Sequence, residues 1–317
     1  MGPGPVVMGV LNVTPDSFAD GGRWSDRAAA VAHGVELWRQ GADLVDVGGE
    51  STRPGAERVP AEIEIARVLP VIRELAAAGV PLSVDTTRAA VATAALEAGA
   101  LVVNDVSGGL ADPVMTKVVA EAGCPYVIMH WRGHSRQMAE LATYQDVVSD
   151  VCTELQARVA DAIAAGVSAD RIILDPGLGF AKTPEHNWQL TRRLDTLLGL
   201  GFPVLIGASL KRYLGRLLAG PDGIERPVSG RAAATVATSV LAIAAGAWGV
   251  RVHDVQGTVD ALAVWRASGS PRVCPPPADL GETPPETPNS EPPVSPRSTG
   301  VAGSGAGLMG EGWTRSA

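Results

Sequence analysis

The chain has 317 residues, of which 46% are hydrophobic and only 4% aromatic, and its formal net charge is −8. This charge, without any basic run, argues against nucleic acid as a partner, although it is compatible with a local site for an anionic ligand. No apolar run is long enough to span a bilayer, no cleavable leader is visible and the three cysteines are scattered, so we expect a cytoplasmic protein that binds no membrane.

Short apolar runs alternate with helical patterns along the first 269 residues. Patterns such as residues 26–42 and 61–79 have apolar residues at i, i+3, i+4 and i+7. The apolar runs occupy residues 6–12, 43–49, 81–85, 101–105, 125–130, 171–177, 203–209 and 248–254. Eight strand–helix repeats in about 260 residues are typical of a (β/α)₈ TIM barrel. A doubly wound open sheet is the alternative, but the lack of GxGxxG after the first strand favours the barrel.

The composition changes near residue 270. Ten of the 24 prolines lie in residues 270–317, a segment without Phe, Ile, Tyr or Lys. Such a segment cannot bury enough apolar surface to offset its ordering entropy. We therefore predict a barrel over residues 1–269 and a disordered Pro/Gly/Ser-rich tail over residues 270–317. A proline-rich docking ligand is the alternative, but no PxxP flanked by basic residues supports it.

Polar residues close nearly every apolar run at its carboxyl end. A turn-forming role explains one or two such residues but not all of them. In a barrel these ends meet at one mouth, where the loops after the strands carry the active site. The sequence therefore predicts a pocket ringed by polar side chains: Asn12, Asp46 with Glu50, Asp85, Asn104, His130, Asp175, Ser209 and His253.

Seven motifs, in order, resemble those of the dihydropteroate synthase family, and its actinobacterial members most closely. They are LNVTPDSFADGG (11–22), GGESTRPGA (48–56), SVDTTR (83–88), NDVSGG (104–109), DPGLGFAKT (175–183), GASLKR (207–212) and RVHDV (251–255). The resemblance implies a TIM barrel that joins 4-aminobenzoate to 7,8-dihydropterin-6-ylmethyl diphosphate and releases diphosphate. It also implies a step of folate synthesis, inhibition by sulfonamides and a homodimer.

A pterin needs carboxylates that accept from its ring N–H and amino groups, and an amide that can both donate and accept. Asp85, Asn104 and Asp175 offer this set from three different strands. The alternative is that each residue caps the helix that follows it, because Asp and Asn are favoured N-caps.

Diphosphate needs cations, and Arg251 and His253 lie two apart on the last predicted strand, so both face the same side. We expect them to clamp the diphosphate together with Arg53, while Thr52 adds a hydroxyl. An ion pair with Asp254 is the alternative. Mg²⁺ is expected to bridge diphosphate oxygens with few protein ligands.

The resemblance assigns several further roles. It makes Asn12 the Mg²⁺ ligand and makes loop 12–22, with Asp16, a lid over the reactants. Phe18 and Phe180 become walls for the aminobenzoate ring, and Lys211 bounds the same pocket beside the pterin. The expected catalytic residues are Asp175, Lys211, Asp16 and Arg53, and Pro54 and Ser209 complete the substrate-binding set. We expect Glu50 to anchor its loop by pairing with a basic neighbour.

Leu210 departs from the family, which usually has SRK where this chain reads SLK. If strand alternation continues to this point, Leu210 faces the outer helices while Ser209 and Lys211 share the other side. The departure keeps open a non-catalytic or regulatory pterin-binding paralogue. A second alternative is a methyltetrahydrofolate methyltransferase that serves a corrinoid partner, because such a barrel shares the inward Asp and Asn residues. The methyltransferase would not need PDSF, STRP or the paired Arg and His.

Overall fold

The computed structural model describes residues 4–14, 22–50, 58–134 and 140–269, with the backbone alone for residues 22–26. Several predictions lie outside these residues. They concern the site residues Asp16, Phe18, Thr52, Arg53 and Pro54 and the tail over residues 270–317.

Eight parallel strands form the centre of the molecule, and each lies within one of the predicted apolar runs. They are β1 (Val6–Asn12), β2 (Leu44–Gly48), β3 (Leu82–Asp85), β4 (Val102–Asp105), β5 (Tyr126–Met129), β6 (Ile172–Asp175), β7 (Leu205–Ile206) and β8 (Gly249–Val252). Their order in the sheet is β6-β5-β4-β3-β2-β1-β8-β7. An isolated parallel bridge between Leu174 and Val204 joins the two ends of this sheet. The predicted (β/α)₈ TIM barrel is therefore confirmed.

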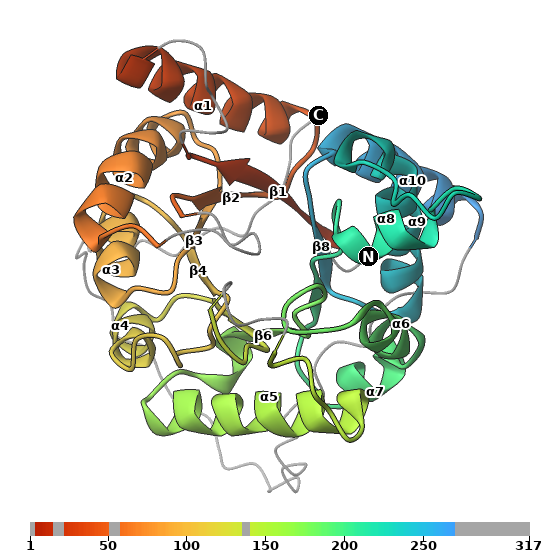
Figure 1. Cartoon of the computed structure of the whole chain (residues 1–317). Helices are drawn as coiled ribbons and strands as arrows, with labels where there is room; N and C mark the ends of the chain where they lie inside the picture. Colours follow the sequence, from red (N-terminus) through yellow and green to blue (C-terminus); the bar gives the residue numbers. More distant parts are fainter. Residues whose placement is uncertain (1–3, 15–21, 51–57, 135–139, 270–317) are drawn as a thin grey trace, which may run out of the picture. The chain divides into compact units, whose positions relative to one another are not determined.

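Helices surround the strands, as Figure 1 shows. They are α1 (Gly22–Arg39), α2 (Ala61–Ala77), α3 (Ala89–Glu97), α4 (Met115–Ala122), α5 (Val147–Ala164), α6 (Pro184–Arg192), α7 (Leu194–Leu198), α8 (Arg212–Leu217), α9 (Ala232–Ala245) and α10 (Val255–Ala267), with 3₁₀ turns η2 (Ala169–Arg171) and η3 (Val228–Gly230). The connections after β6 and β7 each hold two α-helices instead of one. In the part of the chain that the structure describes, no helix has the length and apolarity needed to cross a membrane.

The period of two along each strand determines what the barrel encloses. One buried cluster takes one side chain from each of six strands: Met8, Leu44, Val102, Val127, Ile173 and Leu205. These residues fill the interior near the amino ends of the strands. Two residues further along three of these strands stand Asp46, Asn104 and Asp175, which therefore face the same interior one layer higher. Strand periodicity thus puts a polar layer directly on an apolar one.

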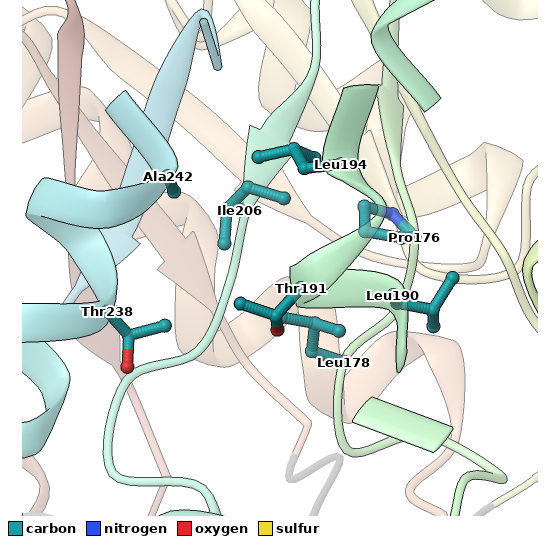
Figure 2. A pocket seen from close by; sticks show the side chains of 8 residues that line it. All are labelled: Pro176, Leu178, Leu190, Thr191, Leu194, Ile206, Thr238 and Ala242. Atoms are coloured by element: carbon teal, nitrogen blue, oxygen red, sulfur yellow. The ribbon is translucent and has the colours of Figure 1, made fainter. Parts of the chain in front are cut away.

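A small cavity lies outside the barrel, between β7 and the helices α6, α7 and α9 (Figure 2). Its volume is about 10 Å³, and its lining is Pro176, Leu178, Leu190, Thr191, Leu194, Ile206, Thr238 and Ala242. This space is about that of one water molecule, and its lining is almost entirely apolar. We interpret it as imperfect packing and place the functional site at the barrel mouth.

Candidate active site

Asp46 stands at the centre of the polar layer. Its carboxylate accepts hydrogen bonds from Ser83 Oγ at 2.6 Å, from Asn104 Nδ2 at 2.9 Å and from Arg251 Nε at 2.6 Å. These donors come from β3, β4 and β8, and Asp46 itself is fully buried. Asp46 was expected among the polar strand ends, without a role of its own in the site. Its position two residues after an inward apolar residue, Leu44, was the signal that could have identified it.

Arg251 joins Asp46 to Asp85. Its Nη2 donates to Asp85 Oδ2 at 2.7 Å while its Nε bonds to Asp46. The alternative partner, Asp254, instead caps α10 by accepting from the backbone N–H of Gly257 at 2.9 Å. Arg251 therefore faces the barrel interior, as predicted, but its partners in the absence of ligand are two carboxylates.

Asp175 and Lys211 complete a group that we call the mouth cluster: Asp46, Asp85, Asn104, Asp175, Lys211 and Arg251. The Asp175 carboxylate accepts from the backbone N–H of Gly177 at 2.7 Å. Lys211 precedes α8, and its Nζ lies 3.9 Å from the centre of the Phe180 ring. The lysine thus reaches from the loop after β7 to the loop after β6.

The helix-cap alternative for the three predicted pterin ligands does not hold. The helices that follow Asp85, Asn104 and Asp175 have their N-caps at Arg88, Val114 and Thr183. The Asn104 amide is instead oriented by Asp46, which takes one of its N–H groups. All three side chains therefore belong to the barrel interior and not to helix ends.

Burial dominates the electrostatics of the mouth cluster. Burial, and to a smaller extent the charge of Asp46, raises the pKa of Asp85 to about 7 against the opposing effect of Arg251. Burial also raises the pKa of Asp175, and it lowers the pKa of Lys211 to about 8. Burial disfavours the charged form of Arg251, but Asp46 and Asp85 outweigh it and raise its pKa. Two carboxyl groups with raised pKa values beside two cations indicate a site prepared for a polar ligand.

The loops after β7 and β8 are joined beside this cluster. His253 Nδ1 lies 2.9 Å from Ser209 Oγ, and the backbone N–H of His253 donates to the same oxygen at 3.2 Å. Ser209 is buried, whereas His253 is exposed at the mouth. The predicted site residues Ser209 and His253 are therefore in direct contact, next to Lys211 and Arg251 in the chain.

The expectation that strand alternation sets the direction of Leu210 is wrong. β7 ends at Ile206, and Leu210 lies in a turn with a left-handed backbone, φ 58°. Its N–H donates to Thr235 Oγ1 at 3.0 Å, and its carbonyl accepts from Arg231 Nη1 at 3.0 Å. The backbone of Leu210 is therefore fastened to the start of α9, and its side chain is half-buried.

Glu50 anchors the loop after β2, as predicted. Its carboxylate bonds to Arg88 Nη2 at 2.8 Å, to Arg58 Nε at 3.3 Å and to the backbone N–H of Val59 at 3.0 Å. The predicted diphosphate-binding residues Thr52 and Arg53 lie between these anchors in the sequence and outside the described residues. Glu50 therefore sets where this loop leaves and rejoins the barrel.

Asn12 ends β1 in register with Gly48 of β2, which is itself in register with Asp85 of β3. Within the described ranges, no group of three or more His, Cys, Asp or Glu side chains could hold a metal ion. A single amide oxygen at this position fits a Mg²⁺ ion that takes most of its ligands from phosphate and water. The donor set is therefore compatible with a cation that arrives together with a diphosphate.

Comparisons with known proteins agree with this geometry. Residues 8–253 match the family model described as pterin binding enzyme. The dihydropteroate synthase of Mycobacterium leprae is 57% identical over 259 residues, which cover 81% of this chain and 91% of the relative. The structure of the Xanthomonas albilineans dihydropteroate synthase in complex with 7,8-dihydropteroate is 44% identical, has a TM-score of 0.75, and is matched over 85% of this chain and 95% of that one. The Yersinia pestis dihydropteroate synthase, solved with a sulfonamide drug complex, is 40% identical with a TM-score of 0.77 and coverage of 84% and 95%. The chain therefore belongs to the dihydropteroate synthases, within the pterin-binding enzyme family.

Proposed function

We propose that the chain condenses 7,8-dihydropterin-6-ylmethyl diphosphate with 4-aminobenzoate to give 7,8-dihydropteroate and diphosphate, in folate biosynthesis. The mouth cluster is the observation that carries this proposal. It presents carboxylates and an amide from β3, β4 and β6, with Lys211 and Arg251 beside them. The relative solved with 7,8-dihydropteroate supports the same product.

The pterin binds to Asp85, Asn104 and Asp175. Their oxygen atoms accept from the ring N–H and amino groups of the pterin, and those contacts replace the water lost on burial. The raised pKa values of Asp85 and Asp175 support this assignment, because hydrogen bonds from a ligand would offset the cost of burying the two charges.

The diphosphate binds to Arg251 and His253 at the mouth, together with Arg53 and Thr52. To reach it, the Arg251 guanidinium exchanges part of its bonding with Asp46 and Asp85 for phosphate oxygens. The family uses a divalent metal ion for diphosphate binding, and we propose that it is Mg²⁺ with Asn12 as its protein ligand. When bound, Mg²⁺ neutralises charge on the diphosphate oxygens.

The aminobenzoate ring lies against Phe180 and the stem of Lys211, with Ser209 nearby and Phe18 as a second wall. Pro54 fixes the direction of the loop after β2. The cation of Lys211 over the Phe180 ring supports a site that accepts a flat anionic ligand at this point. Sulfonamides, one of which accompanies the Yersinia pestis relative, would compete for the same place.

The reaction breaks the bond between the pterin methylene carbon and diphosphate oxygen, and forms a bond from that carbon to the amine nitrogen, which loses one proton. Because diphosphate leaves readily once its charge is neutralised, cleavage runs ahead of bond formation and the methylene carbon becomes cationic. Asp175 balances this charge, while Lys211, Arg53 and Asp16 hold the reactants in line. Charge stabilisation and positioning supply the acceleration, without a nucleophilic side chain.

The test measures dihydropteroate formation by the purified chain from both substrates with Mg²⁺. We expect turnover that Asp175→Asn lowers by more than about a hundredfold, because it removes a positioned charge. Binding of the pterin diphosphate without turnover would identify a non-catalytic paralogue. Methyl transfer from methyltetrahydrofolate to a corrinoid would identify the methyltransferase.

We also propose a homodimer and a cytoplasmic location. Exposed apolar side chains on and between α8, α9 and α10 support the dimer: Leu217, Ile224, Val228, Leu241 and Val264. Sedimentation velocity should show a dimer that Leu241→Asp weakens, and a monomeric wild type would refute it. Cys124 and Cys152 are free and buried, which supports a reducing compartment.

A further inference from the structure

A chain of polar side chains centred on the buried His130 contacts the loop that carries Phe180. It lies outside the mouth cluster. Lys182, in the loop after β6, has its Nζ 2.9 Å from His130 Nδ1. His130 follows β5 and places its Nε2 3.0 Å from Glu154 Oε2 on α5. The histidine is only 2% exposed, whereas the Glu154 side chain is 39% exposed. These contacts tie the loop after β6 to two other elements of the barrel.

The donors and acceptors of this chain define the state of its histidine. A lysine ammonium group can only donate, so His130 Nδ1 accepts from Lys182. His130 Nε2 then carries the hydrogen and donates to Glu154. Burial, together with the neighbouring charge of Lys182, lowers the pKa of His130 to about 4, in agreement with a neutral ring. His130 therefore links Lys182 to the Glu154 carboxylate without adding a charge, while burial lowers the pKa of Lys182 to about 7.

The contacts return to the same loop by a second route. Arg132 donates to Glu154 through Nε at 3.2 Å and through Nη2 at 2.5 Å. Its guanidinium carbon lies 3.8 Å from the centre of the Tyr144 ring, and the Tyr144 hydroxyl donates to the carbonyl of Ala181 at 3.0 Å. The side chains thus form a closed circuit that starts and ends on adjacent loop residues. We call it the tether ring: Lys182, His130, Glu154, Arg132 and Tyr144.

The loop that the tether ring holds has an unusual backbone conformation. Gly177 and Gly179 have positive φ angles of 67° and 80°. Ala181 also has a positive φ, 45°, which a non-glycine residue adopts only at a cost of about 1–2 kcal/mol. Lys182 Nζ additionally donates to the carbonyl of Phe180 at 3.2 Å. The ring therefore bonds to the carbonyls of residues 180 and 181 and opposes relaxation of the strained backbone between them.

The position of this loop determines the position of two side chains of the site. Phe180 lies under Lys211 Nζ, and the stem of Lys211 passes so close to Gly179 that a Cβ atom there would lie 2.8 Å from Lys211 Cδ. A shift of the loop would therefore move the aromatic wall and the cation together. Asp85 and Asn104 lie on β3 and β4 and would not follow such a shift.

We propose that Lys182 and His130 are positioning residues for the second substrate, holding the Phe180 loop where Phe180 and Lys211 enclose the aminobenzoate ring. The inference rests on the proposed function, which assigns these two side chains to aminobenzoate. It places the determinants of aminobenzoate affinity partly behind the pocket, in residues that do not touch the ligand.

The experiment compares full-length Lys182→Met with the wild type, with both substrates varied. We expect the KM for 4-aminobenzoate and the inhibition constant of a sulfonamide to rise about tenfold, because misplacing a binding wall costs affinity. The KM for the pterin diphosphate should stay within about twofold, because Asp85 and Asn104 stand on β3 and β4 and Asp175 is held at the end of β6, ahead of the loop that moves. Lys117→Met, on the exposed face of α4, is the matched control and should change neither constant.

Conservative variants separate positioning from general stability. His130→Gln keeps an acceptor for Lys182 and a donor for Glu154, so it should retain near-normal aminobenzoate KM, whereas His130→Leu should match Lys182→Met. Tyr144→Phe removes only the hydroxyl that bonds to Ala181 and should raise the aminobenzoate KM about threefold. Thermal unfolding of each variant verifies that the measured protein is folded.

Two results would overturn the positioning role alone. One is a folded Lys182→Met or His130→Leu variant with unchanged aminobenzoate KM and sulfonamide inhibition. The other is an equal rise in KM for both substrates, which would mean that the ring only supports the fold. A wild type that forms no dihydropteroate would instead refute the proposed function and the positioning role with it.

Discussion

The mouth cluster and the tether ring are both polar networks with buried members at the carboxyl ends of strands. The pKa values of their carboxyl groups nevertheless shift in opposite directions. In the mouth cluster the pKa of Asp85 is raised to about 7 and that of Asp175 is also raised, in both cases mainly by burial. In the tether ring, burial acts the same way on Glu154, but hydrogen bonds from His130 and Arg132 outweigh it and lower its pKa to about 2.

This difference indicates which network awaits a ligand. Glu154 of the tether ring has its charge balanced by His130 and Arg132, although burial lowers the pKa of Lys182 to about 7. The side chains of this ring bond to one another and to the loop backbone, so the network works as scaffold. In the mouth cluster three carboxylates face Arg251 and Lys211, and the free-energy cost of burying these charges is not fully compensated. A ligand with several N–H donors and an anionic group would supply what is missing.

The largest expected effect follows from removing Lys211, one of the two cations of the mouth cluster. Lys211→Ala should lower kcat/KM by more than about a hundredfold, or ~2.7 kcal/mol, because the side chain lies beside both the proposed pterin site and the proposed aminobenzoate site. Steady-state kinetics with both substrates measures it. The same change in the tether ring, Lys182→Ala, should be smaller and confined to aminobenzoate. Equal effects at the two lysines would remove the distinction between ligand site and scaffold.

A substitution at Asp46 tests whether the activity depends on the buried carboxylate at the centre of the mouth cluster. Asp46→Asn keeps the shape but takes the charge from the acceptor shared by Asn104 and Arg251. We expect kcat/KM to fall ten- to a hundredfold, about 1.4–2.7 kcal/mol, the range for hydrogen bonds to charged groups. Asp43→Asn, at the other end of β2, is the control and should affect stability more than turnover. An unimpaired Asp46→Asn enzyme would contradict the central role of this carboxylate.

The two networks should give opposite dependences of stability on pH. Asp85 has its folded pKa raised from 3.8 to about 7, so the folded state holds its proton longer and stability falls as pH rises from about 4 to 7. His130 has its folded pKa lowered from 6.5 to about 4, so the unfolded state takes the proton first and stability falls as pH drops from about 6.5 to 4.

Urea unfolding at pH 5 and pH 7 measures both dependences. Compared with the wild type, Asp85→Asn should shift the difference in unfolding free energy between pH 7 and pH 5 upward, and His130→Gln should shift it downward. Each shift should be about 1–2 kcal/mol, since one pKa unit corresponds to ~1.4 kcal/mol. Shifts of the same sign in the two variants would show that the networks do not differ as described.

Substitution of Leu210 should have a smaller effect than the substitutions in the mouth cluster. Because its backbone is fastened to Thr235 and Arg231 and its side chain belongs to neither network, Leu210→Arg should change kcat/KM by less than about tenfold, under ~1.4 kcal/mol. Steady-state kinetics of Leu210→Arg and Lys211→Ala, measured under the same conditions, compares their kcat/KM values. A nearly inactive wild type rescued by arginine would favour the non-catalytic paralogue instead.

The smallest expected effect is removal of the C-terminal segment. Truncation after Gly269 should leave the Tm and turnover nearly unchanged if residues 270–317 are disordered, because neither network would lose a contact. Calorimetry and a turnover assay check this. A fall of several degrees in Tm would show that the segment packs on the barrel and that the predicted boundary is wrong.

Local sequence pattern was enough to predict the strands and the residues facing the barrel interior. Eight apolar runs with helical patterns between them predicted the barrel, and the polar residues closing nearly every run predicted the mouth, because the carboxyl ends of barrel strands meet at one edge. His130, one of these residues, lies in the tether ring instead. Asp85, Asn104 and Asp175 were identified in this way, whereas Arg251 was identified from its spacing to His253 and from the charge of the diphosphate. The period of two is a property of the chain itself, so no long-range contact was needed to see it.

Only the tertiary structure decided which of these side chains bond to each other. Asp46 and Arg251 are 205 residues apart, and no local pattern shows that one accepts from the other. The direction of Leu210 depended on where β7 ends, which its bonds to α9 helped to determine. The tether ring likewise combines residues 130, 154 and 182 through packing of α5 against the barrel. Sequence periodicity determines which side of an element a residue faces, whereas its partner depends on distances that exist only after the barrel closes.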